Sequence, residues 1–151
     1  MKTEFDQARS FAYRVLAFRR RTRRELELRL EQKGFSMEIS RRVLELMVTY
    51  SYIDDKAFAR LWVEQRLSKR GLPGLRRELL GKGVQPDIID ETLSEFGEDV
   101  EYGAAMELAK KRVGIRGGVC LIPRLAGYLE RRGFSYEAIG KVCRTLRDKE
   151  G

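Results

Sequence analysis

One short motif occurs three times in this chain at nearly constant spacing. Lys33-Gly34-Phe35-Ser36 is followed by Lys82-Gly83-Val84-Gln85 and by Arg132-Gly133-Phe134-Ser135, so the glycines lie 49 and 50 residues apart. A period of this length is typical of chains built from stacked supersecondary units. The repeat therefore constrains the fold to three similar units and argues against one core folded back on itself.

Apolar residues keep a common register around each glycine. Two leucines, four residues apart, precede every glycine, and four further core positions follow it, at offsets of 0, 4, 5 and 8 from the first of the four. This spacing marks one face of an α-helix. In chain order the expected core positions are Leu26, Leu30, Ile39, Val43, Leu44 and Met47; Leu75, Leu79, Ile88, Thr92, Leu93 and Phe96; and Leu125, Leu129, Ala138, Val142, Cys143 and Leu146.

A third helix is predicted ahead of each helix pair. These helices are expected over about residues 4–20, 55–70 and 101–112, with Phe11, Val15 and Phe18 as apolar positions of the first. No stretch alternates polar and apolar residues long enough to predict a strand. We therefore expect an all-α fold of three tandem three-helix repeats, stacked into an elongated, curved array. The predicted repeats are residues 1–50, 51–98 and 99–151.

Turn and cap residues agree with this arrangement. Each motif glycine is expected to adopt the left-handed conformation that ends a helix. Pro73 and Pro123 share a register position that suits the first turn of a helix. The segment Thr22-Arg23-Arg24-Glu25 predicts a capping box. The glycine-rich segment 114–118 is interpreted as a flexible connection.

The residue inventory gives no support to catalysis. Histidine is absent, which removes the commonest general base and most zinc sites. The two cysteines lack metal-ligand spacing, and Cys143 is expected to be a buried, reduced thiol. Asp54 and Asp55 could form a carboxylate pair, but they open a periodic helix, which favours a capping role. We expect no catalytic residue, no metal site and no cofactor.

Basic charge is the strongest functional signal. The formal net charge is +8, and residues 1–50, 51–100 and 101–151 carry +5, −2 and +5. Basic clusters end the first helix of each predicted unit, and stacked units would align them in a row that can follow a phosphate backbone. One cation at each helix C-terminus would be explained by the helix dipole. Two of the three clusters hold three basic residues, which is more than the dipole requires. The predicted contact residues are Arg19, Arg20, Arg21, Arg24, Lys69, Arg70, Arg76, Arg77, Lys110, Lys111, Arg112, Arg131 and Arg132.

The middle of the chain resembles a known family. The segment from Tyr52 to Arg60, YIDDKAFAR, is similar to the most typical segment of RecX, the bacterial regulator of the recombinase RecA. The resemblance covers roughly residues 12 to 146. It continues in Ala17-Phe18-Arg19-Arg20, Leu26, Leu30, Lys33-Gly34-Phe35, Arg70-Gly71, Arg76-Arg77-Glu78-Leu79, Lys82-Gly83-Val84 and Arg132-Gly133-Phe134-Ser135-Tyr136.

The resemblance implies a function as well as a fold. Members of this family are three-repeat helical proteins, not enzymes, and they bind the RecA filament on single-stranded DNA in its helical groove. They commonly inhibit its ATPase, strand exchange and coprotease activities. The expected partners are thus the RecA filament and single-stranded DNA, with double-stranded DNA left open, and the expected protein is a cytoplasmic monomer without a membrane partner.

Three other classes of function stay open from the residues alone. A stand-alone nucleic-acid-binding module would bind bare DNA as tightly as recombinase-coated DNA. A metal-dependent enzyme built on carboxylates would need a divalent metal and would lose turnover in variants of Asp54 or Asp55. A protein-binding helical solenoid would also fit the repeat pattern.

Overall fold

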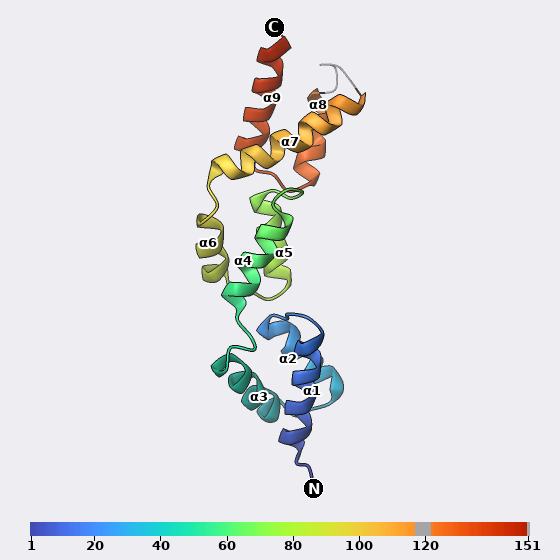
Figure 1. Ribbon diagram of the computed structural model, residues 1–151, viewed down its shortest axis with the longest axis vertical. Helices are drawn as coiled ribbons and strands as arrows, with labels where there is room; N and C mark the ends of the chain where they lie inside the picture. Colours follow the sequence, from blue (N-terminus) through green and yellow to red (C-terminus); the bar gives the residue numbers. More distant parts are fainter. Residues whose placement is uncertain (117–121, 151) are drawn as a thin grey trace. The chain divides into compact units, whose positions relative to one another are not determined.

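The computed structural model describes residues 1–116 and 122–150, and all regular secondary structure within these ranges is helical (Figure 1). The all-α prediction is therefore confirmed. The helices are α1 (Glu4–Phe18), α2 (Arg23–Lys33), α3 (Met37–Thr49), α4 (Asp55–Arg66), α5 (Leu72–Gly81), α6 (Pro86–Ser94), α7 (Glu98–Arg116), α8 (Ile122–Arg131) and α9 (Tyr136–Glu150).

The chain divides into two compact units. The first comprises Met1–Arg60 and Leu79–Ile89, and the second comprises Leu61–Glu78 and Asp90–Gly151. The boundary passes through α4, α5 and α6. The three repeat boundaries expected from the sequence remain a prediction.

The core of the first unit lies among α1, α2 and α3, which pack against one another (Figure 1). The amphipathic spacing of each helix supplies one apolar face to this core. The phenylalanine rings of Phe11 and Phe35 pack at its edge, with centroids 6.0 Å apart. The buried residues are Ala8, Ala12, Val15, Leu26, Leu30, Val43, Leu44, Met47 and Ile53.

A second core lies among α7, α8 and α9 in the second unit. Cys143 is buried in it as a free thiol, as predicted. Tyr102 packs against this core, and its hydroxyl lies 3.0 Å from the Thr145 hydroxyl. The buried residues are Ala105, Met106, Ala109, Ile122, Leu125, Leu129, Phe134, Ile139, Val142 and Cys143.

The helix register is correct at most of the expected core positions, although Leu93, Phe96 and Leu146 are only partly buried. Ile39 and Ile88 were expected in the core but are only partly buried, whereas the next residues, Ser40 and Ile89, are buried. Neighbouring residues can share the apolar arc of a helix, because that arc is wider than one position. Thr92, the one polar residue in the expected core, is 5 % exposed.

Three predicted helix ends were wrong. Helix α1 ends at Phe18, because the backbone becomes extended at Arg19, and the apolar Phe18 side chain is 84 % exposed. Helix α4 ends at Arg66, so the basic residues expected in its last turn follow it. Helix α7 continues to Arg116, which makes the start of the expected flexible connection helical. Gly117, Gly118 and Cys120 lie outside the described residues.

The three motif glycines end helices as predicted. Gly34, Gly83 and Gly133 have φ angles of +98°, +85° and +83°. Glycine adopts this left-handed conformation without the steric penalty that a Cβ atom brings. Their surroundings differ, however: a Cβ on Gly34 would meet nothing within 4 Å, whereas one on Gly83 would lie 2.3 Å from the Arg24 Cβ.

The second and third glycine turns each pack onto the start of an earlier helix. In the first unit the Thr22 hydroxyl donates to the Lys82 carbonyl at 2.7 Å. In the second unit the Gly71 amide donates to the Arg132 carbonyl at 3.0 Å. Thr22 and Gly71 are 49 residues apart, and Lys82 and Arg132 are 50 apart, so the same junction forms twice.

An acidic side chain completes each junction. Asp55, in the first turn of α4, accepts a hydrogen bond from the Arg23 amide at 3.0 Å. Glu101, in the first turn of α7, accepts one from the Leu72 amide at 2.8 Å. These amides belong to the first residues of α2 and α5, which have no partner within their own helices. The two carboxylates therefore accept from helix-end amides that would otherwise lack a partner. Their position also suits the positive end of the helix dipole.

We expect alanine to be costlier at Gly133 than at Gly34. At Gly34 the left-handed conformation alone should cost about 1–2 kcal/mol of unfolding free energy. At Gly133 a Cβ would also lie 2.5 Å from the Gly74 Cα, which should cost about 1–3 kcal/mol more. Urea unfolding measures both.

Gly103→Ala is the matched control for these substitutions. Gly103 lies inside α7, and a Cβ there meets nothing within 4 Å. Alanine at this position should raise the unfolding free energy by about 0.5–1 kcal/mol, because it favours the helix. Equal losses of unfolding free energy in Gly34→Ala and Gly133→Ala would contradict the close packing of the second-unit junction.

Candidate anion-binding site

The predicted basic residues of the first unit lie around the start of α2. Arg19 and Arg20 are exposed, and the Arg19 guanidinium lies 3.7 Å from the Glu25 carboxylate. Arg24 is paired with Glu27. Arg21 is partly buried, its Nε has no hydrogen-bond partner, and burial lowers the pKa of its guanidinium. These four residues therefore differ in their availability to a ligand, although all four were predicted as contact residues on the same grounds.

Four other predicted residues meet in the second unit. Arg70, Arg77, Arg131 and Arg132 line a hollow of about 290 Å³, whose remaining lining residues are Gly74, Glu78 and Gly133. We call this the arginine hollow. Arginine presents a planar set of donors that matches phosphate and carboxylate groups. The sequence register had placed these residues in separate clusters, and the structure brings them together.

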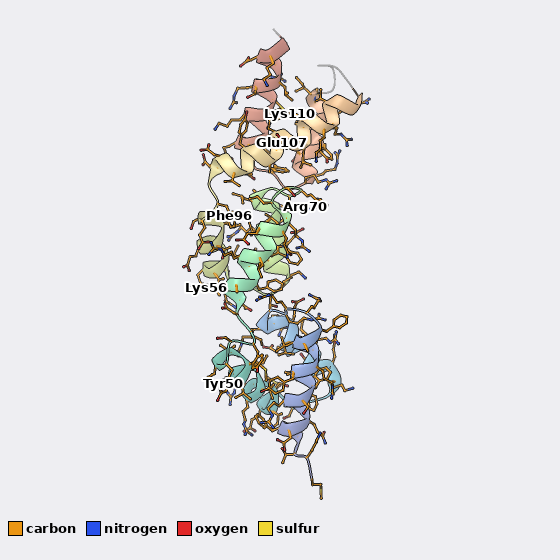
Figure 2. The ribbon with its side chains drawn as sticks, viewed as in Figure 1. Tyr50, Lys56, Arg70, Phe96, Glu107 and Lys110 are labelled. Carbon is orange, nitrogen blue, oxygen red and sulfur yellow. The ribbon has the colours of Figure 1, made fainter. Side chains whose placement is uncertain are left out.

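The glycine junction positions these arginines. Arg70 follows α4 (Figure 2), Arg77 lies on α5, and Arg131 and Arg132 end α8 and begin its turn. The Gly71 amide donates to the Arg132 carbonyl, and the Gly74 amide donates to the Gly133 carbonyl, each at 3.0 Å. Because side chains at 71 and 74 would collide with this turn, the absence of a Cβ at both glycines permits the arginines to converge.

One carboxylate balances only part of the positive charge. Glu78 lies with Oε1 3.6 Å from the Arg70 Nε, while its Oε2 accepts a hydrogen bond from the Trp62 indole at 3.0 Å. Arg77 and Arg131 are exposed, and neither forms an ion pair with an acidic residue of the described ranges. The hollow therefore combines four cations with one anion, which favours an anionic ligand.

An aromatic ring connects the hollow to the basic end of α7. The Arg112 guanidinium lies 4.2 Å from the centre of the Tyr128 ring, and that of Arg132 lies 5.2 Å from the same centre. Such cation–π contacts hold guanidinium groups in place. Lys110 and Lys111 are exposed on the same helix (Figure 2). The clustering of basic residues did not identify Tyr128. Its position four residues before Arg132 nevertheless places it beside the glycine turn that follows α8.

Two predicted contact residues stand apart from the hollow. Arg76 is partly buried and paired with Asp90, so its charge is already balanced. Lys69 is exposed in the turn after α4. The expected row of three equivalent basic clusters stays a prediction.

The two adjacent aspartates are structural. The Asp54 carboxylate accepts a hydrogen bond from the Ala57 amide at 3.1 Å, which is the capping geometry predicted. Asp55 instead caps α2 through the Arg23 amide, and burial raises the pKa of its carboxyl. No group of three or more potential metal ligands occurs among residues 1–116 and 122–150. Across these same residues, no helix has the length and apolar content of a membrane span.

Family models and relatives match most of the chain. The model of the first three-helix domain of RecX matches residues 8–45, and that of the second matches residues 54–93. "Regulatory protein RecX" of Streptomyces coelicolor is 34% identical over 151 residues, covering 97% of this chain and 80% of the relative. The protein of the same name from Amycolatopsis mediterranei is 34% identical over 135 residues, covering 86% and 77%.

Solved structures agree with the fold. RecX from Lactobacillus salivarius superposes with a TM-score of 0.87 at 19% identity, covering 95% of this chain and 97% of that one. Another crystal structure of regulatory protein RecX gives a TM-score of 0.80 at 23% identity, covering 92% and 71%. The chain belongs to the RecX family.

The raised pKa of Asp55 predicts a pH-dependent effect of Asp55→Asn. The folded chain holds this proton more tightly than the unfolded chain, so the carboxyl favours folding below its ordinary pKa of 3.8. That contribution is lost as pH rises through the folded pKa. Asparagine keeps the acceptor for the Arg23 amide without the charge. Urea unfolding should therefore show Asp55→Asn gaining stability relative to wild type between about pH 3 and pH 7. If Asp55→Asn instead loses stability relative to wild type as the pH rises over that range, the raised pKa of Asp55 is wrong.

Proposed function

We propose that this protein regulates the RecA recombinase by binding its filament on single-stranded DNA, and that inhibition is the direction of its effect. Membership of a family whose relatives are named regulatory proteins carries the proposal. The unbalanced charge of the arginine hollow supports an anionic target. The protein acts by occupancy and not by catalysis, as a cytoplasmic monomer without a cofactor.

The proposed mechanism follows from arginine chemistry. Guanidinium groups form paired hydrogen bonds with the oxygens of phosphate or carboxylate groups. A filament on DNA offers both, so a regulator lodged in its groove can hold the filament through several such contacts. The three proposed repeats would let one molecule touch more than one recombinase protomer. Occupying the groove lowers ATPase and strand exchange either by excluding the second DNA strand or by favouring disassembly, and coprotease activity falls with them.

The test is recombinase ATPase on single-stranded DNA. Wild-type protein, added below one copy per recombinase, should reduce the ATPase rate. Arg77→Glu with Arg131→Glu should weaken that reduction, because both residues are exposed in the arginine hollow. Arg147→Glu, exposed on α9 and outside the hollow, is the matched charge control. If excess wild-type protein leaves ATPase and strand exchange unchanged on every DNA tested, regulation of RecA is excluded.

The charge balance of the hollow also favours a second candidate, a stand-alone DNA-binding module. The two candidates differ in the partner required: the module binds bare DNA as tightly as recombinase-coated DNA. A regulator of the filament binds the coated DNA more tightly. Comparing both affinities at one salt concentration separates them, because salt alone changes the affinity for phosphate.

We expect Glu78→Gln to tighten the binding of single-stranded DNA and Arg77→Glu to weaken it. Glutamine keeps an acceptor for the Trp62 indole but removes the one negative charge of the arginine hollow. Fluorescence anisotropy of a labelled oligonucleotide measures the affinity, which should fall steeply with salt for wild type because counterions are released. The salt slope should be shallower for Arg77→Glu. Identical affinities for the three proteins would mean that DNA does not occupy the hollow.

A further inference from the structure

A second hollow adjoins the arginine hollow. It measures about 400 Å³ and shares Arg77 and Gly133 with its neighbour. We call it the tyrosine hollow, because Tyr136 contributes its aromatic ring. Its other distinguishing residues are Pro73, Glu130 and Glu137.

The Tyr136 ring is exposed but held in place. It is the first residue of α9, after Ser135, whose hydroxyl accepts a hydrogen bond from the Ala138 amide at 3.2 Å. The ring is 78 % exposed, and its hydroxyl donates to the Glu130 carboxylate at 3.5 Å. An exposed tyrosine alone needs no explanation. Here, however, the ring lines a hollow that opens beside four arginines, where a flat apolar ligand could stack on it.

Charge separates the two hollows. The arginine hollow has four cations and one carboxylate. The tyrosine hollow has two carboxylates, Glu130 and Glu137, and the shared guanidinium of Arg77. A phosphate is attracted to the first and repelled by the acids of the second. A nucleobase suits the second, because its face stacks on an aromatic ring and its ring or amino N–H groups can donate to carboxylates.

The geometry points to a nucleotide subsite for single-stranded DNA: the phosphodiester lies in the arginine hollow, and its unpaired base stacks on Tyr136. Arg77, which lines both hollows, lies between the two groups. This inference deepens the proposed function, on which it rests, by naming the part of the filament that the site contacts. A duplex does not satisfy the subsite, because its bases are already paired and stacked.

The experiment uses the full chain without recombinase and three labelled probes: a thymidine oligonucleotide, an abasic oligonucleotide of equal length, and a duplex. Wild type should bind the thymidine probe most tightly. Tyr136→Ala should lose about five-fold or more of that affinity, since stacking of one base has this order of energy. Its affinity for the abasic probe should not change. Tyr136→Phe should behave as wild type, because it keeps the ring.

Phosphate binding has its own variant and controls. Arg131→Ala should lower the affinities for the thymidine probe and the abasic probe by the same factor, because both probes keep their phosphates. Tyr50→Ala and Arg147→Ala are matched controls; both positions are exposed and lie outside the two hollows. They should leave the affinity for all three probes within about two-fold of wild type. Circular dichroism confirms that each variant is folded.

A direct readout complements the affinities. In Tyr136→Trp, the thymidine probe should quench the added indole fluorescence and the abasic probe should not, with wild type reporting the background from Trp62. The base assignment is overturned if Tyr136→Ala weakens both probes equally or neither, or if quenching is the same with both. The phosphate assignment is overturned if Arg131→Ala changes neither affinity.

Recombinase ATPase is measured separately with the same variants. If wild type inhibits the recombinase while Tyr136→Ala binds both probes as wild type does, the nucleotide subsite is wrong and the proposed function stands. If probe binding follows the expected pattern but wild type does not affect the recombinase, the subsite stands and the regulatory proposal fails.

Discussion

The seating of a glycine turn on the start of an earlier helix is the contact on which the rest of the structure depends. It forms between Lys82 and Thr22 in the first unit, and between Arg132 and Gly71 in the second. In each case an acidic side chain from the second helix along the chain, Asp55 of α4 or Glu101 of α7, accepts from the first amide of α2 or α5. Buried backbone donors must find partners, so these few hydrogen bonds determine which helices meet and where basic side chains converge.

The amino-acid sequence predicts this fold well because the glycine repeat, the helical spacing of apolar residues and the cap residues all indicate the same helices. Leu26, Leu75 and Leu125 occupy equivalent core positions, and all three are buried. The errors occur where local signals are weak: a helical pattern does not show that the chain becomes extended at Arg19, so the predicted helix was extended too far. Likewise, adjacent apolar residues at 88 and 89 do not reveal which of them faces the core.

The candidate site was only half predictable. Net charge identified its arginines as an exposed basic set, but it treated residues 70 and 77 as belonging with their own helices. Their convergence with Arg131 and Arg132 depends on backbone hydrogen bonds made by Gly71 and Gly74, and nothing in residue composition encodes such a tertiary contact. The proposed roles of Tyr136 and Glu78 depend on the same juxtaposition, so the family resemblance, which includes both residues, did not indicate which groups lie beside them.

The caps also set the order in which this chain can complete its structure during synthesis. A ribosome makes the N-terminal segment first, and α1, α2 and α3 have all been synthesised by residue 50. At that moment the start of α2 still lacks the carboxylate of Asp55 and the carbonyl of Lys82. The first compact unit, which includes Leu79–Ile89, is therefore complete only after α4, α5 and the first half of α6 have been made. A nascent chain stalled before these residues would leave α2 incompletely capped and more accessible to chaperones and proteases.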